Sequence, residues 1–484
     1  MYFEYENFVN FLTGHIYSEK FVTFLKVTST SLIGLGAIYI IKIFNSYRYF
    51  RPMGIKTVDH KFFFGNSKEL NKNYLEKLKS WTRKYGKTYG YFEGHLPVLV
   101  TSDLNILKVV FNQHHFFANR PNSFEWTRMK NIMDPINSTE NLKVLGPSMI
   151  KCADRMLEVL ENELEIEIDI MEYLKRFTLD SIWNCALDID LNVQFDHNLF
   201  NRFEKMLNQR HFGVSISTYF HEFANLINKF KSSEPISKII SDVVDKRKID
   251  GTRKNDYLQL ILDAPNNQDS QITFLEIKQN LAIFIHTGYK SISNILGYCV
   301  YTLACYQEEQ QKLYDEIKTI FYSEDDIRID FETLNEIEYL DMFIKEVLRF
   351  YPIKRVSRVC TKTFNRNGIH IPEGTIIEAD VLSIHFDKDL WGPIDPNEFN
   401  TQRFKDKRNP LGFLSFGTDC IGMKFELIQL KIAVCKLVLK YEFLPLSERN
   451  KQLDIVEDLV REPKNGIKIT LRKRLDHFNL FEFY

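Results

Sequence analysis

The chain has 484 residues, 44% of them hydrophobic, and is therefore long enough to bury a sizeable core. Its 63 lysines and arginines nearly balance 64 aspartates and glutamates, and the charges are dispersed rather than gathered on a basic face, which argues against nucleic acid as a partner. No glycine-, serine- or proline-rich linker interrupts the chain, which indicates one large domain.

An apolar segment covers residues 21–44, with Lys26 and Lys42 as its only charged residues. It is long enough to span a bilayer. Basic residues follow the segment and acidic residues precede it, so the positive-inside rule places everything after residue 45 in the cytosol. We therefore expect a lumenal tail at 1–20, a transmembrane anchor at 21–45 and a cytosolic domain at 46–484. The alternatives are an interfacial helix and a cleaved signal peptide, although no small-residue cleavage site follows the segment.

Seven cysteines are scattered along the chain without a C-x-x-C pair or a spacing typical of a disulfide framework. This pattern indicates a reducing compartment, in agreement with a cytosolic domain. We expect most of them to be ordinary buried thiols, with at most one that has a chemical role. They are Cys152, Cys185, Cys299, Cys305, Cys360, Cys420 and Cys435.

Beyond the anchor, the hydrophobic pattern predicts mainly helices with a minor, scattered β part. Residues 90–103 alternate around a glycine and a proline and predict a hairpin. Residues 143–162 and 169–186 have the apolar spacing of helices. Strand and turn chemistry returns at 368–385, and 466–474 is typical of a closing strand.

The longest helical pattern covers residues 274–317, contains no proline and is apolar all round in its middle, so we expect it to cross the interior. A second membrane span is the alternative, but His286 and Lys290 would make it costly. Gly288 sacrifices about 1 kcal/mol of helix propensity, which indicates that something needs the space beside the backbone.

Three separated stretches together resemble the cytochrome P-450 superfamily, specifically the microsomal animal enzymes that oxidise lipophilic compounds. They are "KEVLRFYP" at 345–352, "TQRF" at 401–404 and "FLSFGTDCIGMKFE" at 413–426. Further matching stretches follow in the family's order over essentially the whole chain. The resemblance implies the cytochrome P-450 fold, a large helical domain with a small β-rich part, together with an N-terminal anchor helix.

The resemblance places Cys420 as the axial thiolate ligand of haem b iron. A thiolate pushes electron density toward the O–O bond. Gly422 gives the turn its conformational freedom. The positive end of the helix that begins near Met423 favours the deprotonated sulfur.

Other residues receive roles by the same resemblance. Glu346 and Arg349 lie three apart on one helix and, with Arg403, match a buried structural charge triad behind the haem, in which each charge needs the others. Trp126 and Lys130 match positions that bind a haem propionate, and Arg358 matches another propionate-binding arginine. The resemblance thus implies five haem-binding residues: Cys420, Trp126, Lys130, Arg358 and Gly422.

The chain departs from the family pattern at several places. The loop before Cys420 is about three residues short, with Thr418 where an arginine is usual and Asp419 beside the sulfur, which should raise the pKa of the thiol. In the long helix, Gly288, Lys290 and Ser291 match the catalytic segment. The Ser291 hydroxyl can serve iron-bound dioxygen, but Lys290 replaces the acid of the proton relay, so we expect altered proton delivery.

We therefore expect a haem-thiolate monooxygenase in the endoplasmic reticulum membrane. It would insert one atom of dioxygen into a lipophilic small molecule, with electrons from an NADPH–cytochrome P-450 reductase and with membrane lipid around its anchor. One alternative is an impaired homologue that binds haem or lipid without efficient turnover. Another is an anchored helical scaffold that binds no haem. The substrate is not indicated by the sequence.

Overall fold

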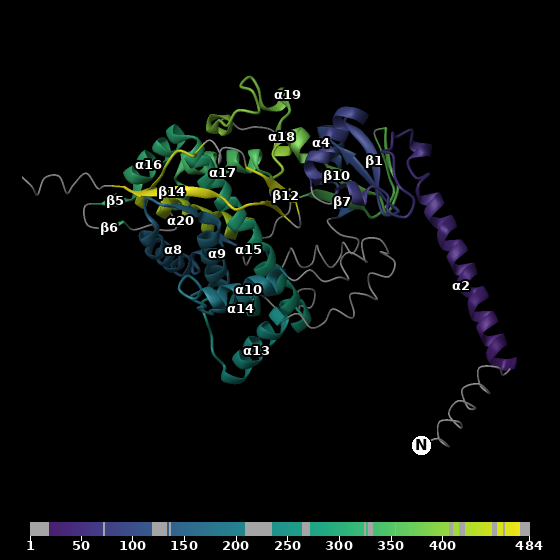
Figure 1. Ribbon diagram of the computed structural model, residues 1–484, viewed down its shortest axis with the longest axis horizontal. Coiled ribbons are helices and arrows are strands. Elements are labelled where there is room, and N and C mark those ends of the chain that lie inside the picture. The colour runs from purple at the N-terminus through teal and green to yellow at the C-terminus, as the bar shows by residue number, and fades with distance from the viewer. Residues whose placement is uncertain are drawn as a thin grey trace, which may run out of the picture.

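The computed structural model describes residues 19–70, 73–118, 133–134, 137–208, 235–263, 272–323, 326–327, 333–353, 355–366, 368–405, 410–415, 422–447, 453–457 and 460–474. Helices make up most of these residues, and short strands form small sheets between them (Figure 1). The predicted mainly helical fold with a minor β part is confirmed.

Helix α2, Glu19–Ser46, projects away from the rest of the molecule (Figure 1). Its outward side chains include Ile33, Leu35 and Ile38, each more than 60% exposed. Among the described residues, one helix, Lys26–Met53, is long and apolar enough to cross a membrane, and only 6% of its apolar window is buried. A buried core helix would have its apolar side chains covered, and this one does not.

The β-rich part lies beside the end of α2 and contains a five-stranded sheet in the order β1-β2-β10-β7-β3 (Figure 1). The predicted hairpin is present as β1, Thr88–Glu93, and β2, Leu96–Thr101, which pair antiparallel. β2 then pairs in parallel with β10, Ile376–Ala379, which joins distant parts of the chain. The remaining strands and the helices packed on this sheet are β7 (Val356–Cys360), β3 (Phe117–Ala118), α3 (Ser67–Leu70), α4 (Tyr74–Tyr85) and α5 (Leu104–Asn112).

The helical part holds the largest apolar core. Three of its helices were expected from periodicity: α8, Gly146–Leu160; α9, Ile170–Leu187; and the long α15, Phe274–Cys305. They pack with α20, Met423–Lys440, around residues such as Trp183 and Phe425 that are almost wholly buried. The other helices are α7 (Thr139–Lys143), α10 (His197–Asn208), α13 (Pro235–Asp250), α14 (Tyr257–Leu262), α16 (Gln307–Phe321), α17 (Glu338–Phe350), α18 (Val381–His385) and α19 (Lys388–Trp391).

The pattern over 274–317 forms two helices rather than one, because the backbone leaves helical geometry at Tyr306. The Gln307 amide donates to the carbonyls of Leu303 and Ala304 and so satisfies the last turn of α15. Glutamates 308 and 309 then occupy the first turn of α16, where negative charge is favoured. The middle of α15 is buried, as predicted, and crosses the helical part.

Strands also close the carboxyl-terminal region. The predicted strand at 466–474 is β14, Lys468–Lys473, which lies between β11, Tyr441–Phe443, and β4, Glu167–Asp169. The strand and turn pattern at 368–385 is present as far as β10, but its last five residues form α18 because Asp380 caps a helix there. The other short strands are β5 (Tyr322–Ser323), β6 (Asp326–Ile327), β8 (Phe364–Arg366), β9 (Ile369–Ile371), β12 (Ile455–Glu457) and β13 (Arg461–Pro463).

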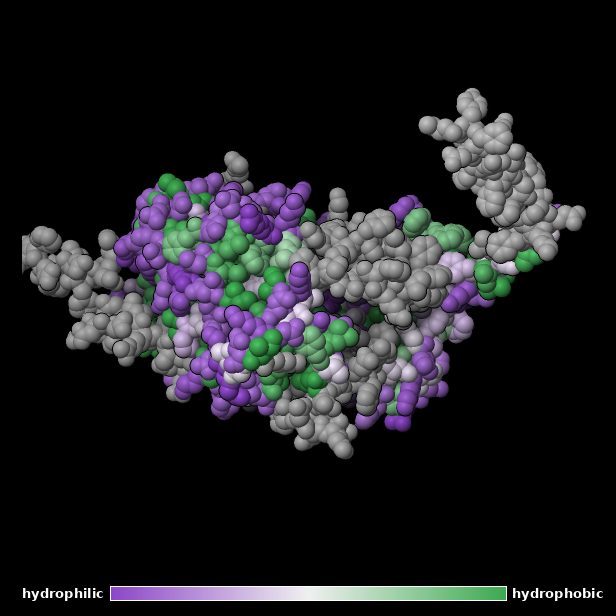
Figure 2. All heavy atoms as spheres, turned by 90° about the horizontal axis from the view of Figure 1, so that it is seen from below, coloured by the Kyte–Doolittle hydropathy of each residue, from purple (hydrophilic) through white to green (hydrophobic). Residues whose placement is uncertain are grey.

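The surface carries no single chemical character on the face seen in Figure 2, where hydrophilic and apolar residues are interspersed over the described parts of the helical body. The six described cysteines form no disulfide with one another, and five of the six are buried. Cys420 lies outside the described residues. The expectation of ordinary buried thiols thus holds for Cys152, Cys185, Cys299, Cys360 and Cys435.

Candidate functional site

The best-defined polar cluster of the molecule surrounds the carboxylate of Glu346 on α17. Arg349 lies one turn later on the same helix, and its Nε and Nη2 donate to the two carboxylate oxygens at 2.7 and 2.8 Å. Neither side chain is exposed. Because the two charges face each other in a fork geometry, each satisfies most of the other's hydrogen-bonding capacity.

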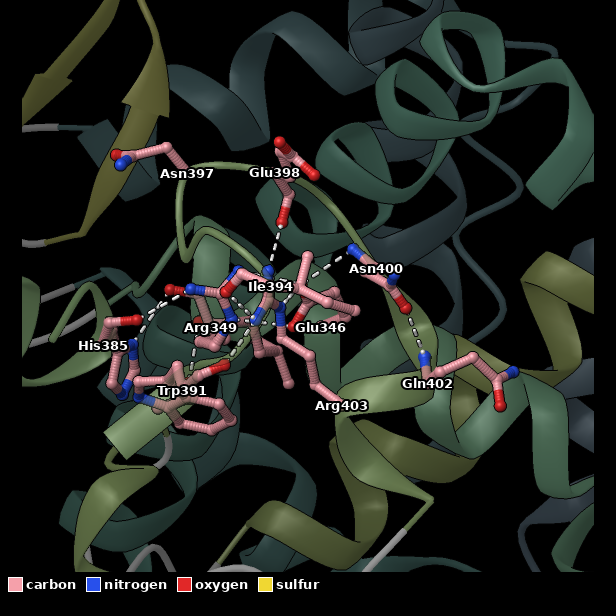
Figure 3. Close-up of polar contacts among 12 residues, drawn as sticks. Glu346, Arg349, His385, Trp391, Ile394, Asn397, Glu398, Asn400, Gln402 and Arg403 are labelled. Carbon is pink, nitrogen blue, oxygen red and sulfur yellow. Dashed lines mark hydrogen bonds and ion pairs between the residues drawn. The ribbon is translucent and has the colours of Figure 1, made fainter. Parts of the chain in front are cut away.

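Arg403 approaches the same carboxylate from the short helix η5, Thr401–Phe404. Its Nε lies 3.4 Å from Glu346 Oε1, and the backbone N–H of Asn400 donates to that oxygen at 3.0 Å. Figure 3 shows Arg349, Arg403 and Asn400 converging on Glu346. The structure thus brings together the three residues that the sequence grouped as a triad.

The rest of the Arg403 guanidinium binds the backbone of the loop that leads to it. Its Nη1 and Nη2 donate to four carbonyl oxygens between residues 391 and 398, including that of Ile394 at 2.9 Å and that of Glu398 at 3.2 Å. In an exposed loop such carbonyls accept hydrogen bonds from water, and here the Arg403 guanidinium takes the place of that water. Arg403 therefore fixes this loop as well as joining η5 to α17.

His385 connects this cluster to the segment that precedes Cys420. Its Nδ1 contacts the carbonyl of Arg349 at 2.9 Å, and the backbone N–H of Leu414 donates to its Nε2 at 2.9 Å. One residue later, Ser415 Oγ donates to the carbonyl of Leu348 at 2.7 Å. The chain is thus fastened to α17 just before residue 416.

The two contacts of His385 require its neutral form, with the proton on Nδ1, because Nε2 accepts from Leu414. Complete burial lowers the pKa of His385 to about 3, and the nearby Arg349 charge acts in the same direction. A second proton, on Nε2, would occupy the lone pair that accepts the hydrogen bond from the Leu414 N–H, so that bond would be lost.

Three of the expected haem-binding residues, Trp126, Lys130 and Cys420, lie outside the described residues. Gly422 is the residue before α20, which begins at Met423. The structure therefore describes both ends of the Cys420 segment, Ser415 on one side and the start of α20 on the other.

Arg358 lies on β7 and is 4% exposed. Its Nη1 donates to the carbonyl of Ser357, and its guanidinium lies over the Phe111 ring at 4.9 Å. Such a buried cation is suited to a carboxylate ligand.

On α15, a Cβ at Gly288 would lie 3.1 Å from Cδ1 of Ile182 on α9. The sequence analysis predicted that something needs the space beside Gly288. That space is occupied by the neighbouring helix α9, which passes close to α15 at this point. Lys290 is half-buried, and Ser291 is wholly buried.

Ser291 meets a residue that the sequence analysis missed, Glu426 in the first turn of α20. The Ser291 hydroxyl is within hydrogen-bonding distance of Glu426 Oε1, at 2.9 Å, and of the Thr287 carbonyl, also at 2.9 Å. Glu426 is only 4% exposed. One signal was available: a glutamate among the apolar residues of a core helix is rarely buried without a specific partner.

Comparison with known proteins agrees with this architecture. A sequence model of the family described as cytochrome P450 matches residues 122–470. The chain belongs to the cytochrome P450 family. Cytochrome P450 3A12 of Canis lupus familiaris is 27% identical over 92% of this chain and 97% of its own length. Cytochrome P450 3A16 of Mus musculus is 30% identical over 81% of this chain and 86% of its own length. This cytochrome P450 is thus similar to its relatives along nearly the full chain.

Cytochromes P450 are haem-thiolate monooxygenases that hold haem iron through a cysteine thiolate. One observation tests whether the described residues fit that group. The buried Arg358 supplies a positive charge that suits a haem carboxylate.

We expect Glu346→Gln to lower the free energy of unfolding by about 3–5 kcal/mol, because it leaves two buried arginines without their counter-charge. Urea unfolding followed by circular dichroism measures the change. Lys345→Gln on the same helix is the control: its Nζ lies 3.6 Å from Asp341 in an exposed pair, and its loss should cost less than about 1 kcal/mol. Equal effects of the two variants would contradict a triad that stabilises the fold.

Acid should loosen the attachment of the Cys420 segment through His385. Because the pKa of folded His385 is about 3, the unfolded chain binds a proton first as the pH falls below about 6.5. The stability that neutral His385 contributes is therefore complete above about pH 6.5 and is lost toward pH 3, by up to about 1.4 kcal/mol per pH unit.

Urea unfolding of the wild type and of His385→Gln at pH 7.5, 6.5 and 5.5 tests this dependence, since few carboxylates titrate in that window. The variant should lose less stability than the wild type between pH 6.5 and 5.5. Parallel pH profiles of the two proteins would rule out His385 as the titrating group.

Proposed function

We propose that this cytochrome P450 oxidises a lipophilic small molecule on the cytosolic side of the endoplasmic reticulum membrane, with electrons from an NADPH–cytochrome P450 reductase. The single observation that carries the proposal is the family match over residues 122–470. The fastening of the chain on both sides of Cys420 supports it, because a ligand loop must be held rigidly.

Cys420 is the proposed axial ligand of the haem iron. Gly422 precedes α20, so the unpaired N–H groups and positive pole of that helix lie close to the sulfur in sequence. They would favour the thiolate. When bound, the haem supplies the oxygen chemistry, and the chain supplies the ligand, the orientation and the exclusion of water.

The propionates of the haem are assigned to Arg358, Trp126 and Lys130. Arg358 is the described member of this set, and its buried guanidinium supports the assignment because its fixed fork of donors matches a carboxylate. Glu346, Arg349 and Arg403 are assigned a structural role, because the partners described for them are other groups of the protein.

Gly288, Lys290 and Ser291 are the proposed residues of the oxygen side. Ser291 would donate a hydrogen bond there, and Gly288 would let α15 pass close to its neighbours. Lys290 stands where the family places an acid, and we propose that it slows proton delivery.

The anchor is assigned to residues 21–45, with residues 1–20 in the lumen and 46–484 in the cytosol. The exposed apolar side chains of α2 and the basic residues that follow it support this orientation. Membrane lipid would then cover the apolar surface that the protein leaves bare.

A homologue that binds haem without efficient turnover is the second candidate, and Lys290 is the observation in its favour. The similarity to relatives along nearly the whole chain favours the enzyme.

The reduced, carbonyl-bound absorption spectrum of the purified full-length protein tests the proposal. We expect the red-shifted Soret band of a thiolate ligand in the wild type and its loss in Cys420→Ser, because the hydroxyl is a poor ligand. Cys305→Ser, which alters a partly exposed thiol at the end of α15, should leave the band unchanged. An unchanged band in Cys420→Ser would refute the assignment.

Lys290→Glu should raise the ratio of product formed to NADPH consumed at least about tenfold, since a positioned acid contributes 10²- to 10⁴-fold to proton transfer. The assay uses reconstituted reductase and a panel of lipophilic alkoxycoumarins, whose dealkylated products fluoresce. Lys278→Glu alters another half-buried lysine of α15 and serves as the control. Equal ratios in all three proteins would show that Lys290 does not limit proton delivery.

A further inference from the structure

Three consecutive phenylalanines, residues 62–64, form an exposed tip beside the end of α2. Phe62, Phe63 and Phe64 are 42%, 38% and 39% exposed. They occupy the turn of a tight loop, which Lys61 and Gly65 close with two backbone hydrogen bonds of 3.1 and 2.8 Å. A surface loop rarely exposes three large apolar side chains in succession unless they have a function. We call these residues the phenylalanine tip.

The backbone of the phenylalanine tip has a conformation that costs free energy. Phe63 has a φ of +71°, in the left-handed region that bulky side chains rarely adopt. Glycine or asparagine would fit there at a lower cost, yet the chain has a phenylalanine at this position. Strain of this kind is typical of functional positions.

The base of the loop is fastened to strand β1. The buried Asn66 side chain donates to the Asp59 carbonyl at 2.7 Å and accepts from the Phe92 N–H at 3.1 Å. Gly65 leaves no room for a side chain, since a Cβ there would collide with the Phe92 carbonyl oxygen. The loop therefore has a rigid base, and its three rings remain exposed.

The phenylalanine tip continues the apolar surface of α2. The Phe62 ring packs against the Phe44 ring near the end of that helix, at 4.9 Å between centroids. Phe44 and Ile41 are themselves 55% and 59% exposed. The apolar run of α2 ends at Ile41, and Phe44 lies about 4.5 Å further along the helix axis. On the proposed orientation, the tip thus lies at the level where acyl chains give way to headgroups.

The charges around the phenylalanine tip suit an anionic surface. From residue 42 to residue 70 the chain has six basic and two acidic residues. Lys61 and Lys68 flank the tip and are exposed, and the Lys68 ammonium lies 4.1 Å from the centroid of the Phe64 ring. Apolar rings bordered by lysines match the boundary between acyl chains and anionic headgroups. Two copies of the tip would instead bring like charges together.

We propose that the phenylalanine tip is a second membrane contact, which inserts its rings into the interfacial layer of the bilayer beside the anchor. The inference rests on the proposed anchoring through residues 21–45. A single helix would leave the rest of the protein free to tilt, whereas a second contact fixes its orientation. The tip is joined to β1, so it holds the five-stranded sheet beside the membrane (Figure 1). Burial of the rings offsets the strain at Phe63.

Quenching of tryptophan fluorescence by brominated lipids tests this contact. The full-length protein is reconstituted in vesicles of phosphatidylcholine and phosphatidylserine, and the wild type gives the background. Phe63→Trp places a probe in the tip, and Ile38→Trp places one on α2, at a residue 66% exposed. Phe195→Trp is the matched control, because it alters a phenylalanine that is 53% exposed between α9 and α10.

We expect bromines near the headgroups to quench the probe at residue 63. Bromines deep in the acyl chains should quench the probe at residue 38 more strongly, and neither lipid should quench the probe at residue 195.

Removal of the rings provides a second measurement, with Phe64→Trp as the probe. Adding Phe62→Ser and Phe63→Asn should lower quenching by the headgroup-level bromines by at least about half, because these two rings supply much of the apolar area that the tip buries. Phe62→Leu with Phe63→Leu keeps an apolar tip and should keep the quenching. Equal quenching with the polar and the apolar pair would contradict insertion of the rings.

The outcomes separate the tip from the anchor. Quenching at residue 38 but not at residue 63 refutes the tip and leaves the anchor intact. If neither probe is quenched, the proposed anchoring fails and the tip with it. Equal quenching at residues 63 and 195 refutes a contact made by the tip in particular. A blue shift of the probe at residue 63 without quenching by bromine would show that protein covers the tip, and would also refute the membrane contact.

Discussion

The carboxylate of Glu346 is the point on which the described site depends. Two buried guanidinium groups and one backbone N–H share its two oxygens. Such a cluster is stable only when complete, because each charge has been removed from water and is compensated by the others. Its completeness fixes the relative positions of α17, η5 and the loop between residues 391 and 398.

Short polar bonds connect this cluster to the start of the cysteine segment, and they add to the apolar packing of Phe413 and Leu414. His385 accepts from Leu414 and contacts the Arg349 carbonyl, and Ser415 donates to Leu348. Hydrogen bonds are directional, so they specify the path of the backbone more narrowly than side-chain packing does. The segment that leads to Cys420 is thereby attached at its start to the same helix that carries Glu346 and Arg349.

The sequence predicted much of this fold because its main elements are local. The hairpin at 90–103, the helices α8, α9 and α15 and the strand β14 follow from periodicities that need no knowledge of distant residues. The break at Tyr306 was missed because no proline or glycine marks it. Gln307, whose amide caps the end of α15, gave no signal either, since a glutamine is equally common on the exposed face of an uninterrupted helix. Helix α18 was missed because its N-cap, Asp380, follows strand β10 without a loop, so the strand pattern hid the start of the helix.

Within the site, Glu346 and Arg349 could be paired from their spacing, whereas Arg403 entered only through the resemblance, since nothing in "TQRF" itself indicates a buried partner. The Ser291–Glu426 pair could not be predicted at all. It joins residues on two helices that are far apart in the chain. Hydrophobic periodicity shows which side of a helix is buried, but not which residue of another helix packs against that side.

The five-stranded sheet has a consequence for biosynthesis. β2 is finished early in the chain, yet its second neighbour is β10, with Val98 beside Ile376. While the ribosome makes the residues between them, the hairpin keeps one row of backbone N–H and C=O groups unpaired, an arrangement that invites pairing with other chains. Strand pairing over such a separation is slow, because the intervening loop must close first. The nascent protein therefore passes through a long stage in which its amino-terminal β region needs protection from aggregation, by chaperones or by its neighbours.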